Sequence, residues 1–150
     1  MNSEQLGPPS IKLGGLQIWV HSRGTSVPPV PYEDEDWLNA TAHCGGAGAD
    51  VWVHGSILTL SAIKTWAEDC EKIQRNLSGR AVLDGIEPEL FVTMEVSDRL
   101  GHLKVNVSIT PDYLRQQHKF EFELDQSYLS SMIQECKTVL SSFGLKVDTP

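Results

Sequence analysis

Five histidines are the first candidates for chemistry in this chain, because an imidazole ring can bind a metal ion or transfer a proton near neutral pH. They are His21, His43, His54, His102 and His118. Their positions lack the HExxH spacing that places two zinc ligands on one helix face. His21, His43 and His54 could converge on a metal or acid–base site if their strands were neighbours facing the same way.

Glu121 and Glu123 are a second candidate, since paired carboxylates can act as the acid and base of a glycosidase. On a strand that rises about 3.3 Å per residue, they lie roughly 6–7 Å apart on one face. Lys119 and Asp125 share that face. These neighbouring charged residues indicate that Glu121 and Glu123 lie on the solvated side of an antiparallel sheet and are not a catalytic pair.

Three cysteines, Cys44, Cys70 and Cys136, form an odd set without CxxC spacing. Cys70 and Cys136 fall on the apolar stripes of predicted helices, which is typical of interior packing. Cys44 follows His43, but adjacent residues of a strand point to opposite faces, so the two are not placed as nucleophile and base. We therefore predict no catalytic residue, no metal site and no cofactor.

Four consecutive carboxylates, Glu33, Asp34, Glu35 and Asp36, follow a proline-rich segment at residues 26–31. Like charges this close repel one another and should point into water. A calcium loop would instead place its oxygen ligands at alternate positions around a glycine. A solvated loop and an acidic patch facing a partner remain as interpretations, so the four carboxylates are candidate partner contacts.

Trp19 and Trp52 are out of phase with the aliphatic residues of their own strands. They are therefore expected on the sheet face that is turned away from the core. An exposed tryptophan on a sheet marks a binding surface or a dimer contact. The competing interpretation is a sheet covered on both faces, with the proline-rich segment as one cover.

The chain has 20 acidic and 12 basic side chains, giving a net charge of −8. This balance disfavours nucleic acid as a ligand, because phosphate binding needs Lys and Arg clusters. It would speed encounter with a basic partner. The N-terminal residues lack an apolar signal segment, and no run of about 18 apolar residues occurs. We expect a cytoplasmic protein without a membrane segment.

The elements that must position these residues follow from hydrophobic periodicity. Apolar residues alternate in seven predicted strands, at 12–21, 37–44, 49–57, 80–83, 90–96, 103–109 and 119–124. Periods near 3.6 predict helices over 60–77 and from Asp125, as the cap, to Gly144. The predicted fold class is α+β, with a mainly antiparallel sheet of six or seven strands and two amphipathic helices packed on one face. Residues 1–10 are expected to form a disordered tail and residues 11–146 a single domain.

Several segments, in this order, resemble the WapI-like family of bacterial immunity proteins from contact-dependent toxin systems. The residues that carry the resemblance are Asp36-Trp-Leu-Asn39, the helix Leu60 to Ser78, and Phe120-Glu-Phe-Glu-Leu-Asp-Gln-Ser-Tyr-Leu129. The match covers about residues 33–143.

The resemblance implies a cytoplasmic, non-enzymatic protein that binds and neutralises a toxin, such as a nuclease-type C-terminal toxin domain. The acidic balance agrees with this, because an acidic inhibitor steers onto a basic partner. No toxin-contacting residue can be transferred from the family to this chain.

Two other functions stay open at the level of sequence. One is a small enzyme with an acid–base site on a sheet face, using His43, His54 or Glu121. The other is a self-associating structural module, a homodimer with Trp19 and Trp52 at a two-fold contact.

Overall fold

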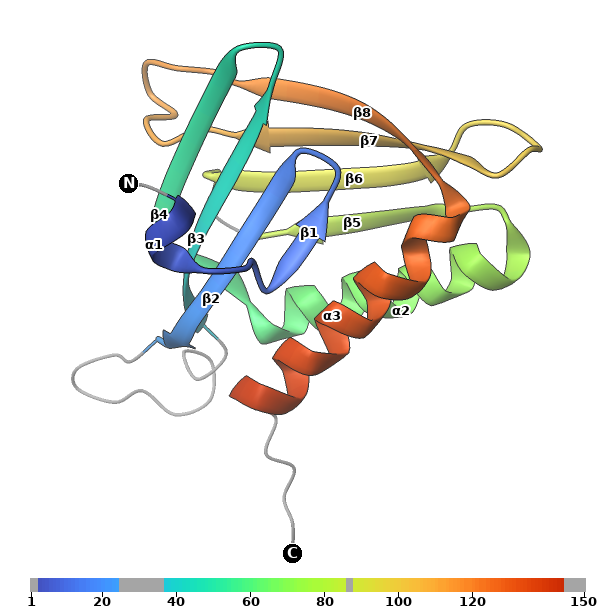
Figure 1. Cartoon of the computed structure of the whole chain (residues 1–150), viewed down its shortest axis with the longest axis horizontal. Coiled ribbons are helices and arrows are strands. Elements are labelled where there is room, and N and C mark those ends of the chain that lie inside the picture. The colour runs from blue at the N-terminus through green and yellow to red at the C-terminus, as the bar shows by residue number, and fades with distance from the viewer. Residues whose placement is uncertain (1–2, 25–36, 86–87, 145–150) are drawn as a thin grey trace, which may run out of the picture.

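Two four-stranded antiparallel sheets, each followed in the chain by a long helix, make up the fold (Figure 1). The computed structural model describes residues 3–24, 37–85 and 88–144. Sheet A contains β1 (Ile11–Leu13), β2 (Leu16–Arg23), β3 (Trp37–Gly46) and β4 (Ala49–Thr59) in that order. Sheet B contains β5 (Arg80–Asp84), β6 (Leu90–Val96), β7 (His102–Ile109) and β8 (Lys119–Asp125) in that order. The helical elements are α1 (Ser3–Leu6), α2 (Leu60–Asn76), the 3-10 turn η2 (Gln126–Tyr128) and α3 (Leu129–Phe143).

The α+β class and the antiparallel pairing are confirmed, while the described residues contain eight strands in two sheets, not six or seven strands in one. The additional strand arises because Gly14, at φ +59°, turns the chain between Leu13 and Leu16. The predicted strand at 12–21 is thereby divided into a hairpin. The sheet divides after Thr59, because α2 separates β4 from β5 and the chain begins a new ladder there.

The core lies between the two sheets and the helix pair, and every strand contributes its apolar side to it. In Figure 1 the helices α2 and α3 run side by side along the margin of the molecule where β1 and β5 lie. Lys137 Nζ lies 2.9 Å from Glu71 Oε2, and Gln74 Nε2 donates to Ser130 Oγ across the same pair of helices. The apolar stripe of α2 is buried and consists of Leu60, Ile63, Trp66, Ala67, Cys70 and Ile73.

The helix ends differ in detail from the sequence prediction. Thr59 Oγ1 accepts a hydrogen bond from Ala62 N and so caps α2, as expected from its residue type. Asp125 makes no such cap, because η2 intervenes and its carboxylate accepts from Ser127 Oγ instead. Gly144, at φ +117°, ends α3 as predicted.

Residues 3–10, part of the segment for which the sequence predicts a tail, contain the single helical turn α1. Ser10 N donates to Ile18 O, and Ser10 Oγ accepts from Val20 N. These bonds join the end of this segment to β2. None of the helices among the described residues is long and apolar enough to span a membrane.

The β3–β4 turn offers a stabilising substitution. Ala47 and Gly48 link the two strands with φ of +52° and +89°, the left-handed pair that a two-residue hairpin turn requires. Glycine adopts this conformation freely and Asn and Asp tolerate it, whereas other residues, including Ala47, are strained there. We expect Ala47→Asn to stabilise the protein by about 1 kcal/mol, raising Tm by roughly 2–4 °C. Calorimetry measures the shift, and Ala49→Asn, one step past the turn, should give no gain.

The three cysteines are buried and free. Desolvation by burial raises the pKa of both the Cys44 and Cys136 thiols to about 12 and also raises that of Cys70. Since the thiolate is the reactive form, we expect none of them to react with iodoacetamide at pH 8 in the folded protein. All should react in strong denaturant. Mass spectrometry counts the adducts, and Ser131→Cys on the exposed side of α3 provides a thiol that reacts at once.

Candidate partner-binding face

The outer faces of the two sheets, turned away from the core, carry different chemistry. On sheet B, oppositely charged residues stand opposite one another from strand to strand, in the row Arg80, Glu95, Lys104 and Glu123. Lys104 Nζ also lies 3.0 Å from Glu121 Oε2, and this contact raises the pKa of Lys104. Glu121 and Glu123 are both exposed. This face is therefore a solvated row of alternating charges that contains one ion pair, Lys104–Glu121.

The outer face of sheet A is aromatic and rich in histidine. We call it the Trp–His face and define it by Trp19, His21, Thr41, His43, Asp50, Trp52 and His54. His43 stands opposite Trp52, and Thr41 stands between Trp19 and His54 in the strand register. Asp50 is the one charged residue in β3 and β4 apart from histidine. Protein interfaces favour this composition, with aromatic residues enriched and charged residues depleted.

The rings of this face stack on one another. Trp19 and Trp52 have centroids 5.8 Å apart with planes 18° from parallel. His54 stacks on Trp52 at 6.4 Å and 17°, and His43 lies 4.4 Å from Trp52 at a tilt of 39°. Trp52 is thus held by rings from β2, β3 and its own strand, which fixes its orientation before any partner arrives.

Three polar contacts, two from the Thr41 hydroxyl and one from the Asp50 carboxylate, order the histidines. Thr41 Oγ1 lies 2.8 Å from His21 Nε2 and 3.2 Å from His54 Nδ1, so one hydroxyl joins the two rings. His43 Nε2 lies 2.7 Å from Asp50 Oδ1, while its Nδ1 is buried and has no hydrogen-bond partner among the described residues. The three histidines of sheet A therefore do share one face, but Thr41 stands between two of them. No group of three or more metal-ligating side chains occurs in the part of the chain that the structure describes.

Trp19, predicted as a partner contact, is only 3% exposed. Its indole Nε1 donates to Gly7 O at 2.9 Å, and Figure 1 shows the segment that carries α1 running alongside sheet A. The N-terminal segment covers this ring. Trp52 is half-buried, whereas His21, His54 and Asp50 are exposed. These four residues are the accessible part of the Trp–His face.

The remaining predicted site residues are placed as follows. Glu33, Asp34, Glu35 and Asp36 lie outside the described residues. His43 and His54 lie on sheet A, whereas Glu121 lies on sheet B. The side chains proposed for acid–base chemistry are thus divided between two sheets.

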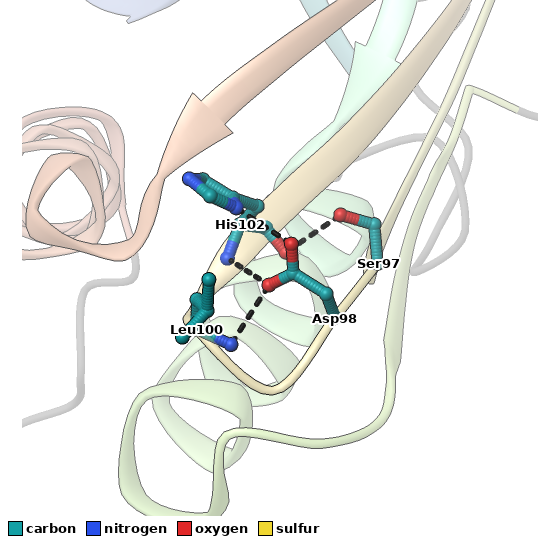
Figure 2. A network of polar contacts seen from close by, with 4 residues as sticks. All are labelled: Ser97, Asp98, Leu100 and His102. Atoms are coloured by element: carbon teal, nitrogen blue, oxygen red, sulfur yellow. Dashed lines mark hydrogen bonds and ion pairs between the residues drawn. The ribbon is translucent and has the colours of Figure 1, made fainter.

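The hairpin between β6 and β7 is ordered by one carboxylate, for which the sequence analysis gave no role (Figure 2). Asp98 Oδ1 accepts from Leu100 N and His102 N, and Asp98 Oδ2 lies 2.6 Å from His102 Nδ1. Ser97 N and Oγ donate to His102 O and close the β6–β7 turn. The Ser-Asp-x-x-Gly spacing is the signal that could have identified it.

Because of the contact between Asp98 and His102 in this hairpin, we expect the stability of the protein to depend on pH. The hydrogen bond and charge of Asp98 raise the pKa of His102, and the same contact lowers the pKa of Asp98. The contribution of His102 to stability is therefore present below about pH 6.5, where the unfolded side chain is protonated, and is lost as pH rises through the raised pKa. The contribution of Asp98 is lost as pH falls through its lowered pKa.

NMR titration of the His102 ring tests this prediction. We expect a pKa above 6.5 in the wild type, falling in Asp98→Asn, which keeps an oxygen for the turn but removes the charge. Asp112→Asn, in the β7–β8 connection, is the matched control. A His102 pKa that is the same in Asp98→Asn and the wild type would contradict the assignment.

The fold and this face define a class: an α+β domain of two antiparallel sheets with one outer face suited to protein contact. The chain belongs to the immunity protein WapI-like family, whose model matches residues 10–144. The family resemblance of residues 33–143 is thereby confirmed, and the match extends to β1 and β2. No curated protein matches the chain.

Solved structures show weaker likeness. A chain of the CdiA-CT/CdiI toxin and immunity complex from Enterobacter cloacae aligns at 11% identity and TM-score 0.45, covering 82% of this chain and 99% of that one. WHY3 from Arabidopsis thaliana aligns at 9% identity and TM-score 0.48, covering 86% and 83% of the two chains. At these values the likenesses support no conclusion about function.

Proposed function

We propose that this protein is a non-enzymatic immunity protein that neutralises a protein toxin by binding it directly through the Trp–His face. The observation that carries the choice of surface is the contrast between the two sheets. On the outer face of sheet B opposite charges face one another from strand to strand and Lys104 pairs with Glu121, whereas the outer face of sheet A presents preorganised aromatic rings next to Asp50, an exposed carboxylate in contact with His43. Membership of an immunity family supports the binding role.

The charge of the protein indicates a basic toxin. With a net charge of −8, the chain attracts a basic domain and repels nucleic acid. A nuclease-type toxin domain fits this requirement, because its substrate-binding surface must be positive. We also propose a second set of toxin contacts, formed by Glu33, Asp34, Glu35 and Asp36. We propose that the two proteins meet in the cytoplasm.

Co-expression with the toxin domain encoded next to this chain tests the proposal. Cells producing both proteins should grow, and the two should purify as a complex. His54→Lys, which places a cation beside Trp52, should abolish protection against a basic toxin. Thr93→Lys places the same cation on the outer face of sheet B and should leave protection intact.

Two results would count against the proposal. If the chain neither binds nor protects against the neighbouring toxin, the immunity function is wrong. If Thr93→Lys abolishes protection while His54→Lys does not, the toxin binds sheet B and the assignment of the surface is wrong.

A further inference from the structure

The edge of β4 that faces away from β3 presents backbone groups that the side chains of the Trp–His face leave unpaired. β4 has 11 residues and is the last strand of sheet A, paired only with β3. Among the described residues, no backbone hydrogen bond reaches β4 from the side away from β3. An edge strand of this kind presents a row of unpaired donors and acceptors that can pair with another chain.

The other sheet edges are short, covered or charged. β1 has 3 residues, and its Lys12 N donates to Glu135 Oε1 of α3 at 2.9 Å. β5 has 5 residues and packs beside α2. β8 carries Lys119, Glu121, Glu123 and Asp125 among its 7 residues. These are the devices by which proteins prevent edge pairing. β4 is longer and contains neither Lys nor Pro, its one charged residue is Asp50, and its register shift lies beyond His54.

The usable part of the β4 edge is Ala49–His54. Beyond it, Gly55 adopts φ +122° and the pairing with β3 shifts register near Ser56. Six residues are enough for a strand of ordinary length to pair with. Within this run, Asp50, Trp52 and His54 point to the Trp–His face, while Val51 and Val53 point to the core side.

A second copy of this chain is a poor occupant of the edge. Each copy carries a net charge of −8, and neither β3 nor β4 contains a Lys or Arg that could offset the approach of another acidic molecule. A basic chain would be attracted instead, since Asp50 is 67% exposed at the start of the edge and its contact in β3 is the His43 ring, with no Lys or Arg in β3 or β4. Charge complementarity therefore selects a basic protein.

We propose that a basic protein partner adds an extended segment to β4 as a fifth strand of sheet A. Its backbone pairs with Ala49–His54. Its side chains alternate, with Lys or Arg beside Trp52 and Asp50 on the outer face and apolar residues beside Val51 and Val53 on the other. The proposal rests on the immunity function, and it identifies the recognised element of the toxin as a strand of alternating basic and apolar residues.

Hydrogen exchange of the purified complex with the neighbouring toxin domain is the test, with binding measured separately by calorimetry. Amides of residues 49–54 should exchange at least about tenfold more slowly in the complex than in the free protein, since pairing protects them. The amides of β8, the charged edge of sheet B, should exchange at the same rate in both.

Charge reversal provides the second readout. Asp50→Lys should weaken binding by about tenfold or more, whereas Asp125→Lys, the matched aspartate on the β8 edge, should change it by less than about threefold. Both sites are exposed, so neither variant is expected to unfold the protein.

The outcomes separate the two proposals. Absence of any binding would refute the immunity function, and the strand addition with it. Binding without slower exchange in residues 49–54 would overturn the strand addition alone. A stable dimer of the chain with protected β4 amides would show that a second copy is the occupant and would also overturn it.

Discussion

Replacing Trp52 by alanine is expected to weaken binding of the partner toxin about 30- to 1000-fold, equivalent to about 2–4 kcal/mol. Trp52 is the half-buried centre of the Trp–His face, with rings of Trp19, His43 and His54 packed around it. A tryptophan held in this way loses little side-chain entropy when a partner covers it. Isothermal calorimetry of wild type and variant with the toxin domain measures the change.

The matched control is Phe91→Ala, which removes an aromatic ring 39% exposed on the outer face of sheet B. It should leave the affinity within about twofold, because sheet B is not the proposed contact surface. Trp52→Phe should recover part of the lost affinity, since it restores a ring in the same stack. Equal loss of affinity in Phe91→Ala and Trp52→Ala would refute the preference for sheet A.

The largest effect on stability is expected from Trp66→Ala, at about 3–5 kcal/mol. Trp66 is among the largest fully buried side chains, and its indole Nε1 donates to Met132 Sδ at 3.1 Å, joining α2 to α3. Removing the ring leaves a cavity where both helices meet the core. A domain of this kind is stable by only about 5–15 kcal/mol in total, so the loss is a large fraction.

Urea unfolding measures this loss as a lower midpoint at unchanged slope. Met132→Leu isolates the contact with sulfur: it keeps the volume but leaves the indole N–H without its acceptor, which costs about 1–3 kcal/mol. A Trp66→Ala variant that loses less than about 1 kcal/mol would show that the helix pair repacks around the vacated site.

Local periodicity was sufficient to locate most elements. The change from period two to a period near 3.6 at Asp125 separates β8 from the helical segment that follows, and Leu129, Met132 and Cys136 of the predicted stripe are buried. The pattern failed at Gly14, where a positive φ reverses the chain. It also could not divide the strands between two sheets, because alternation shows which side of a strand is buried and not which strand lies beside it.

For the Trp–His face, too, the sequence indicated one part of the arrangement and the tertiary structure was needed for the other. The out-of-phase positions of Trp19 and Trp52 correspond to the outer face of sheet A, where the two rings stack. The sequence could not show that the segment before β1 covers Trp19 while leaving Trp52 half-exposed. That outcome depends on a contact between Gly7 and Trp19, which periodicity within a strand does not encode.

The amino-acid sequence by itself determined the element types, the burial side of each strand, the acidic character and the family resemblance, because these depend on composition and on neighbours along the chain. Only the tertiary structure decided that His21, His43 and His54 share a face with Trp52 and that β4 is a free edge. Both depend on the register and order of strands. These are fixed by packing between residues distant in sequence, so they leave no local pattern to read.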